Sequence, residues 1–180
     1  MTRQASDLLL YEKQEYYLNV EILNEYFKKY PDKYFKSESC NTSLWRGYIA
    51  VFEIKKDLLY VKKIKILTSN NFRKLNDFCY KEPCDWFTGL IRIDDFKGEF
   101  DDEDNMEAVF EYLEIKNGVL RNHYRLKFDE FKRFKNSLFK RYKKTPEFQK
   151  ELAVWHNAGL NITESKKIIS KNFLRYYREI

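Results

Sequence analysis

The sequence has few cysteines and histidines and no long hydrophobic run. Its three cysteines, Cys40, Cys79 and Cys84, are an odd number, which argues against a disulfide framework. With two histidines and no paired C-x-x-C spacing, the chain does not favour a zinc site. The longest early apolar run, residues 8–11, is far below the ~18 residues that a membrane-spanning helix needs. We therefore expect a cytoplasmic protein without membrane contact, metal or cofactor.

Apolar and aromatic residues are abundant, at 43% and 18% of the 180 residues. A disordered chain carries far fewer, so the protein should fold, with room for one good core and a small helical appendix. The 14 tyrosines and 15 phenylalanines imply that much of this core is ring packing.

The net charge of +6 is concentrated near the C-terminus. Residues 129–180 contain 13 lysines and arginines against 6 acidic residues, whereas residues 1–128 contain 21 against 22. Such asymmetry suggests an acidic partner surface or nucleic acid, although a solvated helical face is the commoner explanation.

Alternating and helical patterns divide the first part of the chain. Residues 7–18 are typical of two short strands, and residues 22–30 of a helix ended by Pro31. A hairpin is predicted over residues 44–66, followed by a short helix or loop over residues 70–78 and a strand over residues 85–93.

The second part contains the clearest hairpin signal and then a change of period. Asn117-Gly118 lies between two strand patterns and supplies the positive φ angles of a type I′ turn. After Phe128 the apolar period becomes helical, and capping residues predict two further helices. The fold class is therefore α+β: a curved antiparallel sheet domain with one early helix (residues 1–128) and a basic three-helix segment (residues 129–180), which packs on the sheet or projects from it.

Three segments carry a resemblance to known proteins: WRGYIAVFEI from Trp45, DWFTGLIRI from Asp85 and LEIKNGVL from Leu113. With these segments in this order, residues 7–120 resemble a widespread family of uncharacterised bacterial proteins. The family has no established activity, so the resemblance implies a fold and no function. The chain departs from it in an acidic loop, where relatives have a segment with glycine and tyrosine, and in the basic helical tail.

Arg46 and Gly47 stand side by side in the most apolar segment of the chain. Arg46 alternates with apolar residues on a strand that is apolar on both faces, and a charge there needs a partner. We expect an ion pair with Asp85 and a cation–π contact with Trp86. Gly47 and Gly89 would then form bulges or make room for a ring. The alternative is that Arg46 faces a ligand pocket.

No catalytic constellation stands out. Asp85, Glu53 and Glu114 lie on predicted strands, but the sequence fixes no histidine or nucleophile near them, so we do not expect an enzyme. The acidic loop of residues 94–104 has enough oxygens for a cation, yet it lacks the ligand spacing of an EF-hand, which favours a solvated loop.

The function expected is a non-catalytic protein-binding module, plausibly an immunity protein that neutralises a bacterial toxin. This expectation rests on small size, the lack of visible chemistry and the resemblance to orphan bacterial proteins. The alternative is a nucleic-acid-associated protein that binds through the basic helices, whose cations include Lys140, Arg141, Lys143 and Lys144.

Overall fold

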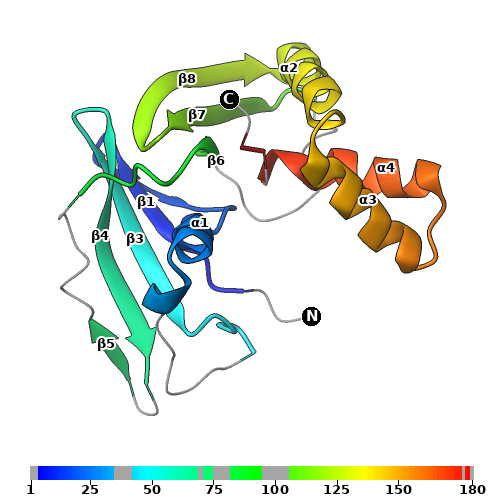
Figure 1. Cartoon of the computed structure of the whole chain (residues 1–180). Coiled ribbons are helices and arrows are strands. Elements are labelled where there is room, and N and C mark those ends of the chain that lie inside the picture. The colour runs from blue at the N-terminus through cyan, green and yellow to red at the C-terminus, as the bar shows by residue number, and fades with distance from the viewer. Residues whose placement is uncertain are drawn as a thin grey trace.

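A computed structural model describes residues 4–34, 42–68, 71–74, 82–94, 106–175 and 177–178. Over these residues the chain forms an open sheet of eight strands and four α-helices (Figure 1). The α+β fold class is therefore confirmed. The elements, in chain order, are β1 (Leu8–Tyr11), β2 (Gln14–Tyr17), α1 (Ile22–Lys29), η1 (Pro31–Lys33), β3 (Tyr48–Lys55), β4 (Leu58–Leu67), β5 (Phe72–Lys74), β6 (Gly89–Arg92), β7 (Val109–Lys116), β8 (Val119–Lys127), α2 (Phe128–Tyr142), α3 (Pro146–Asn157), α4 (Ile162–Asn172) and η4 (Phe173–Arg175).

The sheet is mixed, so the prediction of an antiparallel sheet is wrong for one pair of strands. The order is β2-β1-β3-β4-β8-β7-β6, with β5 also paired to β4, and β1 runs parallel to β3. Parallel neighbours need a crossover connection, and here α1 and the residues after it return the chain across the sheet. Strand β2 occupies the outer side of β1, and β3 lies on the inner side, parallel to β1.

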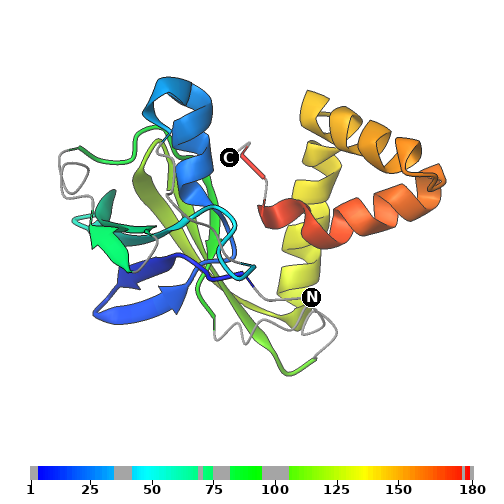
Figure 2. The ribbon, with the colours of Figure 1, turned by 90° about the horizontal axis from the view of Figure 1, so that it is seen from below.

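The sheet has two halves that meet at a narrow junction. Strand β8 pairs with β4 only at Leu58 and Val119, and the β7–β8 hairpin then bends away from β4 (Figure 1). Seen from below, α1 and β1–β4 occupy one side of the molecule and the three C-terminal helices occupy the other (Figure 2).

The molecule has two hydrophobic cores, and β6 and β7 contribute side chains to both of them. In the first, α1 packs Ile22 and Leu23 against Leu9, Ala50 and Phe52 of the β1–β3–β4 half. The alternation of β3, in which Tyr48, Ala50 and Phe52 are buried, gives the strand its core face.

The second core joins the three C-terminal helices to β6 and β7. Phe131 of α2 stacks on Phe110 of β7 with ring centroids 4.0 Å apart, and Phe173 and Tyr177 extend the ring packing beyond α4. The helical segment therefore packs on the sheet, which was one of the two placements that the sequence left open.

The predicted helix starts are confirmed. Thr145 accepts a hydrogen bond from the Phe148 N–H at the start of α3, and Pro146 takes the first helical position. Asn161 and Glu164 form the expected capping box of α4. None of the helices in the described part of the chain has the length and apolar composition needed to cross a membrane.

Part of the sequence-based description was wrong or lies outside the described residues. Residues 72–74 form strand β5, where a short helix or loop was predicted. Cys40, Cys79 and residues 95–104 of the acidic loop lie outside the described residues. Asp94, at the start of that loop, forms an ion pair with Arg92 instead of standing free in solvent.

Candidate protein-binding site

Arg46 lies in a turn just before β3 and not inside the strand. The strand begins at Tyr48, because Gly47 has φ +70° and its N–H donates to the carbonyl of Leu44 over 3.0 Å. Gly47 therefore forms no β-bulge: it makes a turn with a positive φ, which glycine adopts most easily. This turn points the Arg46 side chain toward the N-terminal segment.

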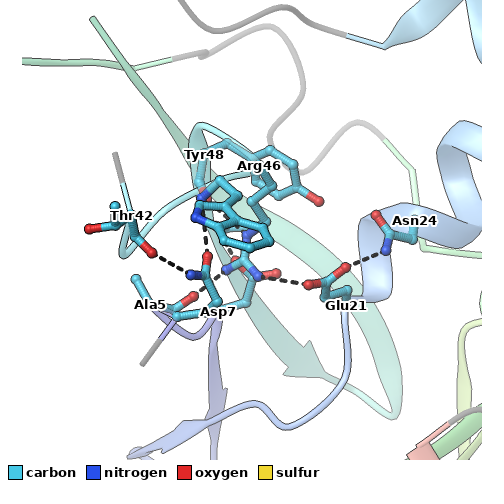
Figure 3. A network of polar contacts seen from close by, with 10 residues as sticks. Ala5, Asp7, Glu21, Asn24, Thr42, Arg46 and Tyr48 are labelled. Carbon is cyan, nitrogen blue, oxygen red and sulfur yellow. Dashed lines mark hydrogen bonds and ion pairs between the residues drawn. The ribbon is translucent and has the colours of Figure 1, made fainter. Parts of the chain in front are cut away.

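The guanidinium of Arg46 is the centre of a polar network (Figure 3). Its Nη2 donates to Asp7 Oδ1 and to the carbonyl of Ala5, both over 2.8 Å, and its Nε donates to the carbonyl of Tyr48 over 3.0 Å. Glu21 stands 3.5 Å from Nη1 and also accepts from Asn24. These contacts hold the turn, β1 and the start of α1 together.

The predicted partners of Arg46 are therefore wrong. Asp85 is exposed and lies beside Cys84, whose N–H bonds to Leu59 at the other end of β4 from Arg46. At ~3.3 Å per strand residue, the two ends of the ten-residue β4 are roughly 30 Å apart. Trp86 packs edge-on against Tyr26, and the ring beneath the guanidinium is Tyr48, with its centroid 5.1 Å from Cζ.

Asp7 is the buried member of the pair and has an altered acidity. Its side chain is fully enclosed, and burial raises its pKa to about 6, although the Arg46 charge and the Ala50 N–H act in the opposite direction. Oδ1 accepts both hydrogen bonds, whereas no donor in the described part of the chain reaches Oδ2. Oδ2 is therefore where a proton would reside below the pKa.

Exposed aromatic residues lie beside this network. Trp45, next to Arg46, is 75% exposed, and its backbone N–H donates to Gln4 Oε1 over 3.1 Å. Tyr34 is 51% exposed and packs on Phe27, which in turn contacts Tyr48.

Tyr26 extends the group toward Trp86, because its ring contacts both Tyr30 and Trp86. We call the set the aromatic surface; it consists of the exposed Tyr30, Tyr34 and Trp45 and the half-buried Tyr26 and Trp86.

The four basic residues singled out from the sequence lie on the helical segment and not on this surface. Lys140 and Arg141 are in the last turn of α2, with Lys143 and Lys144 directly after it, and all four are exposed. Arg141 stands over the ring of Tyr177. In the described part of the chain, no ion pair forms at Lys140, Lys143 or Lys144. The structure thus places the predicted residues in three groups: Arg46, Asp85 with Trp86, and the basic helix end.

Comparison with known proteins found no matching family model, no similar curated protein and no similar solved structure. The resemblance to uncharacterised bacterial proteins stays a prediction.

The sequence did not identify Asp7, Glu21, Tyr34 or Trp45 as site residues. Asp7 reaches Arg46 because β1 is parallel to β3 and Leu8 pairs with Val51, which sets Asp7 level with Ala50. A single acid directly before the apolar run of residues 8–10 was the one local signal for a buried carboxyl.

Proposed function

We propose that this protein is a non-catalytic protein-binding module and that the aromatic surface is its binding site. The observation that carries the proposal is Trp45, a tryptophan that is 75% exposed on a turn fixed by the buried Arg46 network. Tryptophan, tyrosine and arginine dominate the few residues that supply most of the binding energy in protein interfaces.

The turn that carries Trp45 is held rigidly. The turn is tied to the N-terminal segment through Gln4, Ala5 and Asp7, so its backbone loses little freedom when a partner binds. An exposed ring on a fixed turn can therefore contribute more of its burial energy to affinity than the same ring on a flexible loop.

In its specific form, the proposal is a cytoplasmic immunity protein that neutralises a bacterial toxin. The small size of the chain and its resemblance to orphan bacterial proteins support this form. The net charge of +6 argues against a nuclease toxin, whose inhibitors tend to be acidic to complement a nucleic-acid site.

The test uses the protein encoded next to this one as the candidate partner. The neighbour expressed alone should harm the host, and co-expression with this protein should relieve the harm and allow the two to co-purify. Trp45→Ala should weaken the complex by about 30-fold or more, as expected for the loss of a central tryptophan. The matched control is Val154→Ala, which removes an exposed apolar side chain on α3 and should leave binding unchanged.

Two results would count against the proposal. A harmless neighbour would remove the immunity form, and a complex insensitive to Trp45→Ala, in a variant that melts like the wild type, would remove the aromatic surface as its site.

A second candidate function is nucleic-acid binding through the basic end of α2. It is favoured by the exposed cations Lys140, Lys143 and Lys144, which pair with no carboxylate in the described part of the chain. Such binding should weaken steeply with salt, and replacing these residues and Arg141 by alanine should abolish it. Failure to retain the protein on nucleic acid at low salt would exclude this function.

A further inference from the structure

A pocket of about 260 Å³ lies between α2, the C-terminal end of α4 and η4. Three phenylalanines from α2 and η4 form its apolar wall, and five polar or charged residues complete the lining. We call it the helical pocket; it is lined by Phe131, Lys132, Lys135, Asn136, Phe139, Ser170, Lys171 and Phe173.

Cations from two helices converge on this pocket. Lys132 and Lys135 come from α2 and Lys171 from α4, and Lys143 lies over the ring of Phe139 at 5.5 Å from its centroid. Three lysines line this one small space, and a bound anion would relieve the repulsion between their positive charges.

The acids of the described residues do not neutralise Lys132 or Lys171. Of the two acids in the first turn of α2, Glu130 accepts from the Lys127 N–H as part of a capping box. Within the described residues, no carboxylate pairs with Lys132 or Lys171.

The remaining lining limits the size and the chemistry of the ligand. Asn136 is exposed and carries an amide that can donate, whereas the Ser170 hydroxyl already donates to the carbonyl of Lys167. Phe139 is half-buried and offers part of a ring surface beside the cations. The volume falls below the ~300 to 1,000 Å³ of pockets for drug-sized ligands, so it fits one charged group attached to one ring or sugar.

We propose that the helical pocket binds a small phosphate monoester of mononucleotide size or less. Lys132, Lys135 and Lys171 contact the phosphate, and the sugar or ring of the ligand lies against Phe139. A phosphate suits the site because lysine binds it as a compact charge and because several donors can share its three oxygens. This proposal is independent of the aromatic surface, so either can fail without the other.

The experiment measures equilibrium binding of adenosine 5′-monophosphate, inorganic phosphate and adenosine to the full chain at fixed salt. The monophosphate should bind saturably and more tightly than either fragment. Lys132→Ala/Lys171→Ala should weaken its binding by roughly tenfold or more, the effect of losing charged hydrogen bonds. The charge-matched control is Lys150→Ala/Lys166→Ala, which removes two exposed cations of α3 and α4 outside the pocket and should change binding little.

Four outcomes would overturn the proposal. The first is the absence of saturable binding of the monophosphate at millimolar concentration. The second is equal weakening in the control, which would show a general charge effect. The third is equal affinity for inorganic phosphate, which would remove the role of Phe139. The fourth is binding of a single-stranded oligonucleotide without binding of the monophosphate.

Discussion

Replacing Arg46 by alanine tests the buried network most directly. The Arg46 side chain is 14% exposed and the Asp7 side chain is fully enclosed, so little water could replace the lost guanidinium. Removing one partner of a buried ion pair costs about 3 to 5 kcal/mol, because the other charge is left without compensation. Since Arg46 keeps some contact with solvent, we expect the free energy of unfolding to fall by about 3 kcal/mol at pH 7.5.

The loss should grow with pH, and Asp7 sets the direction. Its pKa is raised to about 6 by burial even though the Arg46 charge lowers it, so the folded-state pKa rises further in the variant. At pH 5 Asp7 is mostly protonated in both proteins, and the variant loses hydrogen bonds alone. Above pH 6 the wild-type carboxyl ionises beside Arg46 whereas the variant carboxyl does not, which adds about 1.4 kcal/mol per pKa unit of further shift.

Urea unfolding followed by tryptophan fluorescence at pH 5 and pH 7.5 measures both effects. Asp7→Asn/Arg46→Ala should lose less than the sum of the single variants, by about 1 to 3 kcal/mol. The control is Arg125→Ala, an arginine that is 75% exposed beside Glu111 and whose loss should cost under about 1 kcal/mol. An Arg46→Ala loss no larger than this control, and equal at both pH values, would refute the buried ion pair.

Three further predictions concern single sites. The free energy of unfolding of Asp7→Asn, relative to that of the wild type, should rise between about pH 4 and pH 6 and then level off. The reason is that the raised pKa of Asp7 makes the wild type, and not the variant, lose stability over that window; urea unfolding at a series of pH values measures it. Gly118→Ala should lower the free energy of unfolding by about 2 to 4 kcal/mol, since φ is +73° and the new Cβ would lie 2.7 Å from the Cys84 carbonyl; an unchanged thermal midpoint would contradict this. Thr145→Ala should cost about 1 to 2 kcal/mol in chemical unfolding by removing the cap on the Phe148 N–H, with the helical circular dichroism signal preserved in the absence of denaturant.

Local signals in the sequence predicted most of the elements correctly. Asn117-Gly118 forms the turn of the β7–β8 hairpin, and the capping residues mark where α3 and α4 begin. These features depend on residues close together in the chain, so the sequence alone can show them. The sheet pairings between distant segments depend on contacts that no local pattern encodes.

The errors in the candidate site come from that same limit. Arg46 was paired with Asp85 on the assumption that two segments with strand patterns would meet. The parallel pairing of β1 with β3, which no periodicity shows, brings Asp7 to Arg46 instead. Arg46 does have a carboxylate partner, as expected of a half-buried arginine. Which carboxylate it is could be identified only once the order and direction of the strands were known.

Gly89 shows how a small residue can connect the two halves of the molecule. A Cβ at Gly89 would lie 3.0 Å from Arg178 Nη1 and 3.2 Å from the Phe87 ring. The glycine therefore leaves room for the Phe87 ring, as one of the two roles predicted for Gly89 requires. Arg178 passes through this space, stacks over Phe87 and reaches Glu25 of α1 at 3.5 Å.

The aromatic surface and the helical pocket lie over different hydrophobic cores. Substitutions that share no contacts and lie well apart have additive effects on stability. Loss of partner binding in Trp45→Ala and loss of phosphate binding in Lys132→Ala/Lys171→Ala can therefore be assigned to different surfaces. A variant at Arg178 could disturb both halves at once, which makes it unsuitable as a control for either site.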